Sequence, residues 1–99
     1  MIIVRRTYVP KAGHGGQMLA LLKQASAAMG AAGFDAPRLL RGWHGDHGVI
    51  YSEQRWESVL AYESSREKVR KTPAITSVFE KIYPTLEKTH HTEILEEVA

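Results

Sequence analysis

Within residues 49–58 the hydrophobic pattern changes from that of a β-strand to that of an α-helix. This change limits the possible folds more than any other feature of the sequence. The segment opens with Val49, Ile50 and Tyr51, whose β-branched and aromatic side chains fit the pleated surface of a strand. Ser58 is a suitable helix N-cap, because its hydroxyl can accept a hydrogen bond from a free N–H of the first helical turn. Apolar residues then recur at helical spacing, at Val59, Leu60, Tyr62 and Val69. The sequence therefore predicts a strand that turns directly into a helix.

The rest of the chain alternates between strands and helices. Predicted strands cover residues 2–9, 37–43, 49–56 and 89–98, and predicted helices cover residues 17–32, 58–72 and 73–86. Thr72 and Pro73 divide the second helical region, because Thr is a cap residue and Pro is best tolerated at the first helical position. The order βαββαβ indicates an α+β, ferredoxin-like fold, with a four-stranded antiparallel sheet and two helices on one face. A chain of 99 residues has the length of a single domain, residues 1–99.

Charge and composition argue against several classes of protein. The chain has 13 Lys and Arg residues against 11 Asp and Glu residues, and a net charge of +2 does not argue for nucleic-acid binding. The basic run at residues 66–71 has no aromatic residues among its charges and is typical of a solvated helix face. The absence of cysteine excludes disulfides and thiolate metal sites. No apolar run is long enough to span a membrane, and residues 1–6 do not fit a signal peptide, so we expect a soluble, cytoplasmic protein.

Each predicted strand carries adjacent apolar residues. The runs are Ile2-Ile3-Val4, Leu39-Leu40, Val49-Ile50-Tyr51 and Ile94-Leu95. Neighbours along a strand point to opposite faces of the sheet, so both faces are predicted to be apolar near the middle. Two helices can cover only one face, and a large exposed apolar patch is rare in monomers. We therefore predict a homodimer packed sheet to sheet, with scattered exposed aliphatic residues as the alternative.

Three motifs resemble those of the dimeric α/β-barrel superfamily. Residues 53–58 (Glu-Gln-Arg-Trp-Glu-Ser), followed by a helix and the Thr-Pro at 72–73, resemble the strand-to-helix signature of antibiotic-biosynthesis-monooxygenase-like domains. Residues 6–8 (Arg-Thr-Tyr) with Gly13 resemble the opening of the NIPSNAP-like branch, and residues 79–87 resemble the end of its second helix. The resemblance covers nearly the whole chain in element order and implies a dimeric α/β barrel.

The chain departs from these families at positions tied to activity. Monooxygenase-like relatives often carry histidines where Ser65 and Ala74 stand, and the haem-degrading branch uses an asparagine at the position of Arg6. That branch also has a Trp and a His in its second helix, which residues 58–72 lack. The NIPSNAP-like opening usually has an acidic residue where Val4 stands. It also has a Pro-Gly pair after its tyrosine, and residues 12–13 of this chain are Ala-Gly instead. Haem degradation is therefore not expected, an oxygenase would lack its usual histidines, and no cofactor or metal is predicted.

The resemblance implies a ligand cavity between the sheet and the helices of each subunit. Val4, Arg6 and Tyr8 alternate along the first strand and share one face. If this face meets the helices, Arg6 and Tyr8 project into the cavity. A buried guanidinium needs an anionic partner or ligand, because an unpaired buried charge is costly. The alternative is that Arg6 pairs with Glu53 or Glu93 in the sheet or at the dimer interface.

Aromatic residues are candidates for the wall of this cavity. Tyr83 follows Phe79 by one turn on an apolar helical stripe, and Trp43 or Trp56 would complete the wall. Trp43, near the predicted hairpin, is a candidate for the rim. For Trp56, fixing the second helix on the sheet is the alternative to stacking a ligand. An Arg6 guanidinium in this setting would orient a carboxylate, phenolate or enolate.

The histidines give weaker signals. They are His14, His44, His47, His90 and His91. Asp46 and the two histidines around it could be interpreted as metal ligands, but neighbouring glycines favour an ordinary hairpin turn. Rings at two consecutive strand positions point in opposite ways and cannot share one ion. One histidine could act as a base near neutral pH, although the sequence identifies no partner to orient it.

Two classes of function remain open on this basis. The first is a cofactor-independent enzyme, an oxygenase or isomerase, acting on a small aromatic or apolar molecule. The second is a non-catalytic ligand-binding or accessory dimer of the same fold. The presence or absence of a cavity with convergent polar groups would discriminate between them.

Overall fold

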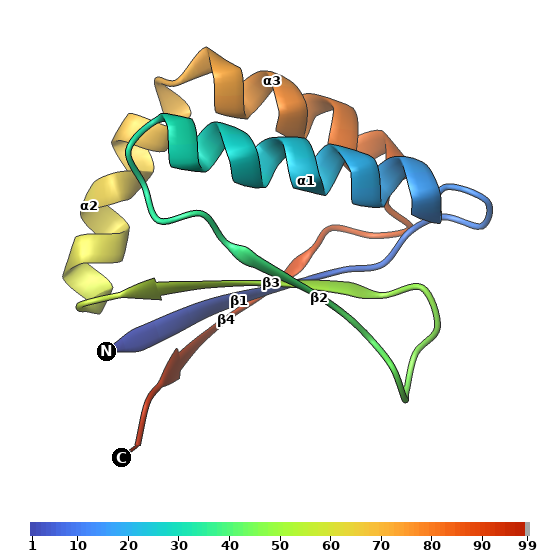
Figure 1. The fold of residues 1–99 in the computed structure, drawn as a ribbon, viewed down its shortest axis with the longest axis horizontal. Helices are drawn as coiled ribbons and strands as arrows, with labels where there is room; N and C mark the ends of the chain where they lie inside the picture. The colour runs from blue at the N-terminus through green and yellow to red at the C-terminus, as the bar shows by residue number, and fades with distance from the viewer. Residues whose placement is uncertain (99) are drawn as a thin grey trace.

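The computed structural model describes residues 1–98; Ala99, the end of the predicted domain, lies outside the described residues. The elements are β1 (Ile2–Tyr8), α1 (Gly15–Ala31), β2 (Arg38–Arg41), β3 (Ile50–Trp56), α2 (Val59–Arg70), α3 (Pro73–Ile82), the 3₁₀ turn η1 (Tyr83–Thr85) and β4 (His91–Glu96) (Figure 1). This order confirms the predicted α+β, ferredoxin-like βαββαβ fold. The second helical region is divided between α2 and α3.

A single antiparallel sheet carries the helices on one face. Its strands lie in the order β2-β3-β1-β4, so that β1 is central and pairs with both β3 and β4. Helices α1 and α3 run side by side over the sheet, and α2 lies at the end where β1 begins (Figure 1). Val4 and Tyr8 are buried beneath the helices, so Arg6 between them also faces the helices and Arg5 faces away.

Several predicted boundaries differ from the structure, and α3, β2 and β4 show why. The helix expected over residues 73–86 ends at Ile82 and continues as η1, because Pro84 has no N–H for the α-helical ladder. The strand expected over residues 37–43 is reduced to β2, because the chain bends from residue 43 onward. The strand expected over residues 89–98 is reduced to β4, which matches the length of the pairing with β1.

The caps of α2 and α3 differ from each other. Ser58 is extended, and its Oγ accepts a hydrogen bond from the Ala61 amide at 3.1 Å, as predicted. Pro73 lies in the first turn of α3, also as predicted. The Thr72 hydroxyl instead donates to the Lys68 carbonyl at 2.7 Å and does not cap α3. The Thr72 side chain therefore closes the end of α2.

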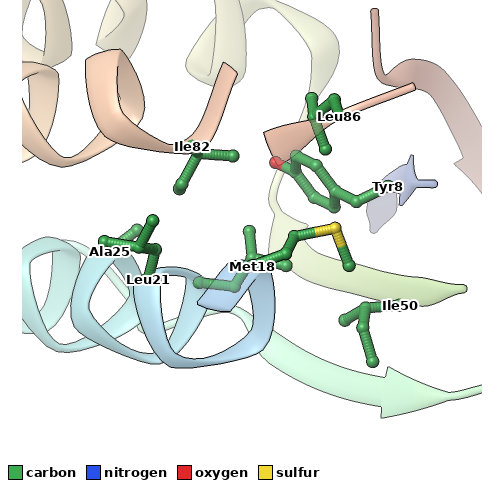
Figure 2. Close-up of a cluster of buried hydrophobic side chains, with 8 residues drawn as sticks. Tyr8, Met18, Leu21, Ala25, Ile50, Ile82 and Leu86 are labelled. Carbon is green, nitrogen blue, oxygen red and sulfur yellow. The ribbon is translucent and has the colours of Figure 1, made fainter. Parts of the chain in front are cut away.

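The hydrophobic core lies between the sheet and the helices in two clusters. The larger consists of Tyr8, Met18, Leu21, Leu22, Ala25, Ile50, Ile82 and Leu86. In Figure 2, the Tyr8 ring lies between Leu86 and Met18 of this cluster. The smaller consists of Ile2, Val4 and Tyr62, with Trp56 packed against it. The clusters therefore tie α1 and α3 to one part of the sheet and α2 to another. Among residues 1–98, every helix is too short or too polar to cross a bilayer.

The outer face of the sheet has a charged centre. The Glu53 side chain, only 10% exposed, accepts from Arg5 and Arg38, each at 2.9 Å. The hydrogen bond from Arg5, followed by that from Arg38, holds the pKa of the Glu53 carboxyl below its usual value against the opposing effect of burial. The prediction that this face is apolar near its middle is therefore wrong at Glu53.

Apolar residues surround this charged centre. Ile3 and Leu95 are paired across β1 and β4 on the outer face, and Leu40 lies on the same face opposite Tyr51. The predicted division of Val49 and Ile50 between the two faces is wrong, because Val49 precedes β3 and both side chains are buried. The outer face is therefore a mixed surface of aliphatic, aromatic and paired charged side chains.

We predict that Ser58→Ala lowers the free energy of unfolding by about 1 kcal/mol, because the Ala61 amide loses its hydrogen-bond acceptor. Urea denaturation followed by circular dichroism measures this change. Ser64→Ala is the matched control, because Ser64 is exposed within α2 and does not cap it. Equal losses in the two variants would contradict the prediction.

Candidate functional site

A cavity of about 340 Å³ lies between the inner face of the sheet and the helices. This volume is within the range of small-molecule sites, roughly 300–1,000 Å³. Its apolar wall includes Leu22, Ala25, Met29, Leu39, Val69, Ile75 and Phe79. Tyr8 of the larger core cluster and Tyr62 of the smaller one both line it, so the cavity adjoins both parts of the core.

Two arginines at this cavity donate to the same phenol oxygen. Arg6 Nη2 lies 2.6 Å from Tyr62 Oη, and Arg66 Nη1 lies 2.8 Å from it. Both guanidinium carbons also lie over the Tyr62 ring, at 5.8 and 5.5 Å from its centroid. Within residues 1–98, neither arginine has a carboxylate at ion-pair distance. The cavity therefore has two positive charges beside it with a neutral acceptor between them.

Local structure explains how this cluster forms. Arg6 reaches the cavity from the helix-facing side of β1, and Tyr62 and Arg66 lie one turn apart on α2. The Trp56 ring packs edge-on against Tyr62 at 5.7 Å and fixes its position. The Trp56 Nε1 atom is buried and has no hydrogen-bond partner among residues 1–98. Trp56 therefore both positions α2 and lines the cavity.

Tyr8 supplies a buried phenol to the same cavity. Burial raises the pKa of Tyr8 above its ordinary value, although the Arg6 charge and the Ser52 hydroxyl act in the opposite direction. Tyr8 is therefore a neutral hydrogen-bonding group at neutral pH rather than a phenolate.

His90, immediately before β4, completes the polar part of the wall. Its ring stacks on Tyr83 at 6.2 Å with an interplanar angle of 9° and lies tilted against Tyr8 at 5.2 Å. Its Nδ1 atom is buried and unpartnered within residues 1–98. Burial, followed by the positive charges of Arg6 and Arg66, lowers the pKa of His90 below its ordinary value. The ring is therefore neutral at pH 7.

The structure brings four of the five predicted site residues to one cavity. Arg6, Tyr8, Trp56 and Tyr83 line it. Trp43 does not, because the loop between β2 and β3 carries it away from the helices and leaves it 90% exposed. Ligand binding by the four lining residues stays a prediction.

The alternative for Arg6, an ion pair with Glu53 or Glu93, is wrong. Arg5 makes the Glu53 contact on the opposite face of the sheet, because neighbouring residues of β1 alternate between faces. Arg6 bonds to Tyr62 instead.

Solved structures share this fold, although no protein-family profile matches the sequence and no curated protein matches it. An uncharacterized NIPSNAP domain protein from Burkholderia xenovorans is similar with a TM-score of 0.83 and 18% identity, over 100% of this chain and 96% of that one. A NIPSNAP family protein from Agrobacterium tumefaciens gives 0.82 and 15% identity, over 98% and 92% of the two chains. An antibiotic biosynthesis monooxygenase gives 0.77 and 15% identity, over 100% of both.

This chain has the NIPSNAP-like fold. The resemblance at residues 6–8 and 53–58 predicted this fold, and the structural similarity confirms it. Identities below 25% establish the fold alone, so the chemistry of the site must be argued from its own residues.

The sequence alone does not identify three residues of this site. The sequence pattern places Tyr62 on an apolar helix face and Arg66 in a solvated basic run. The spacing of these two residues, four apart on one helix, was an available signal that they meet. His90 was not placed at the cavity, although strand alternation puts it on the same side as Thr92, the cross-strand neighbour of Arg6.

The remaining histidines lie away from the cavity. His44 and His47, with Asp46, are exposed in the loop between β2 and β3, and His91 is exposed opposite Thr7 on the outer face. Among residues 1–98, no group of three or more His, Cys, Asp or Glu side chains is arranged to hold a metal ion.

We predict that His90→Gln flattens the dependence of stability on pH between about pH 7 and pH 5. The folded protein resists protonation of His90, whereas the unfolded chain binds the proton near the ordinary pKa of about 6.5, so wild-type stability falls as the pH drops through this range. Urea denaturation at several pH values measures the slope. His91→Gln, one residue away on the exposed face, should keep the wild-type slope. A wild-type slope in His90→Gln would contradict the prediction.

Proposed function

We propose that this protein binds a small aromatic or apolar molecule with one anionic group in the cavity between its sheet and helices. The observation that carries the proposal is the pair of arginines, Arg6 and Arg66, that converge on Tyr62 beside an apolar cavity without a carboxylate partner. The N–H donors of a guanidinium group bind a carboxylate or an enolate oxygen more strongly than they bind a neutral phenol. An anion near Tyr62 Oη would therefore reduce the repulsion between the two guanidinium groups.

The rest of the lining suits the apolar part of such a ligand. Leu22, Met29, Ile75 and Phe79 form an apolar surface that favours an aromatic or aliphatic group. The Trp56 ring adds aromatic surface to the same wall. The ligand we propose is thus amphipathic, with its charged end toward Arg6 and Arg66.

The cavity also bears on whether the protein is an enzyme or an accessory protein. A solid core between sheet and helices would have favoured the accessory role, and a cavity with convergent polar groups favours ligand binding. The similarity to a structure named an antibiotic biosynthesis monooxygenase adds support for a cofactor-independent oxygenase or isomerase. The alternative is a ligand-binding protein that performs no reaction.

We predict that aromatic carboxylates stabilise the protein and that Arg6→Gln or Arg66→Gln weakens their binding about 10- to 100-fold. Each substitution removes a charge-assisted hydrogen bond of about 1.5–3 kcal/mol. Benzoate, phenylacetate and phenylpyruvate are compared with benzamide and phenylacetamide by thermal shift and titration calorimetry.

Arg41→Gln is the matched control for this experiment. Arg41 is an exposed arginine at the end of β2 and does not line the cavity. The proposal fails if none of the carboxylates binds, if the amides bind equally well, or if the Arg6 and Arg66 variants bind like wild type.

We infer in addition that a second copy of this chain covers the outer face of the sheet. The face has aliphatic residues around the paired charges of Arg5, Arg38 and Glu53, and Glu93 lies opposite Arg5 on β4. Its charges are balanced, so two copies can pack face to face without net repulsion. An isologous dimer is the simplest assembly that buries such a face.

We predict that Ile3→Asp weakens this dimer, because Ile3 and not Ile2 points to the outer face. Light scattering and sedimentation velocity at micromolar concentration measure the change. Leu60→Asp is the control, since Leu60 is 74% exposed on α2, away from the sheet face. A wild-type monomer, or equal dissociation in both variants, would contradict the inference.

A further inference from the structure

The cavity holds one feature that anion binding alone does not explain. Of the chain's five histidines, His90 lines the wall that also contains Arg6 and Arg66. Stacking on Tyr83 and contact with Tyr8 hold the ring in place, although its Nδ1 has no hydrogen-bond partner among residues 1–98. The imidazole ring therefore lines the same space as two groups that stabilise negative charge, and Nε2 is the ring nitrogen left to meet a bound molecule.

We infer that this cavity catalyses proton transfer on an aryl-substituted 2-oxo acid, with His90 as the base and Arg6 and Arg66 as the groups that hold the carboxylate and the enolate oxygen. The inference rests on the proposed function, since the substrate must first bind through the arginine pair. The reacting class is narrower than the binding class, because the ligand must carry an acidic C–H beside its carbonyl group.

Each part of this substrate class matches a part of the cavity. The carboxylate and the adjacent carbonyl oxygen fit the donors of Arg6 and Arg66. The aryl ring fits the apolar wall around Phe79 and Met29. The acidic benzylic C–H lies between the two and can meet the wall that carries His90.

The charges around His90 suit a base. Arg6 and Tyr8 face it from β1, Arg66 from α2 and Tyr83 from η1, and exposed Glu80 of α3 lines the same cavity. Burial and the two arginines keep the imidazole neutral, and so able to accept a proton, at neutral pH. The same positive charges stabilise the anion that forms as the proton leaves.

The step needs no oxidant, reductant or co-reactant. The benzylic C–H bond breaks, its proton goes to His90, and the electron pair becomes the C=C bond of an enolate whose oxygen is held by the arginines. Because Nδ1 is buried, Nε2 is the ring nitrogen that accepts the proton. The imidazolium then returns the proton to the enolate oxygen, which gives the enol, or to carbon, which restores the ketone.

Phenylpyruvate in D₂O tests the inference. Nuclear magnetic resonance follows benzylic hydrogen exchange, ultraviolet absorbance follows the enol, and calorimetry gives the dissociation constant. We expect the wild-type protein to exchange the benzylic hydrogens faster than buffer alone. This exchange rate should fall as the pH drops through the pKa of His90. His90→Gln should lose at least about 100-fold in rate, the lower end of general acid–base effects, with binding unchanged.

Three further variants keep the test decisive. His90→Phe retains a ring between Tyr8 and Tyr83 without a nitrogen, so it separates loss of the base from loss of packing. His91→Gln, on the exposed face, should keep the wild-type rate. Glu80→Gln tests the carboxylate that lines the same cavity: if this variant loses activity while His90→Gln retains it, Glu80 is the base and the inference is wrong.

The outcomes separate this inference from the proposed function. If phenylpyruvate binds through Arg6 and Arg66 but exchange is no faster than in buffer, the proton-transfer inference is overturned and ligand binding stands. If no aromatic carboxylate binds to wild type, both are overturned. Exchange that persists in His90→Gln and His90→Phe also overturns the assignment of the base.

Discussion

The hydrogen bond from Arg6 to Tyr62 Oη connects the central strand to the helix at the end of the sheet, and the bond from Arg66 to the same oxygen lies within that helix. Arg6 belongs to β1, and Arg66 belongs to α2 together with Tyr62, so one phenol joins two elements that are far apart in sequence. Two guanidinium groups on a neutral oxygen leave their charge uncompensated. The position of α2, the electrostatics of the cavity and the ionisation of His90 all depend on this cluster.

Alternation along β1 separates two uses of arginine in adjacent residues. Arg5 points outward and forms, with Arg38, an ion-paired group around Glu53 that satisfies its charge within the sheet. Arg6 points inward, where its side chain donates to Tyr62 Oη. Arg5 thus stabilises the sheet, whereas Arg6 leaves a positive charge at the cavity. The two arginines differ because successive side chains of a strand point to opposite faces.

The stacked ring of His90 shows how this packing affects chemistry. Contact with Tyr8 and Tyr83 removes water from the imidazole, and the Arg6–Tyr62–Arg66 cluster adds positive charge nearby. Both effects disfavour the imidazolium, so they act in the same direction on the pKa. For Tyr8 burial and the Arg6 charge act in opposite directions, and burial dominates. Burial therefore keeps both residues neutral at pH 7, with the help of the charge cluster at His90 and against it at Tyr8.

Local patterns in the sequence were enough to predict the order of elements, the Ser58 cap, the break at Pro73 and the shared face of Arg6 and Tyr8, because each depends on residues close together in the chain. Only the tertiary structure decided the partners of Arg6, the exposure of Trp43 and the place of His90. Those outcomes depend on which strands become neighbours and on how α2 packs at the end of the sheet, so they join residues as far apart as Arg6 and Tyr62. A single sequence carries the periodicity that builds each element, but the distances between elements arise only when the core is packed.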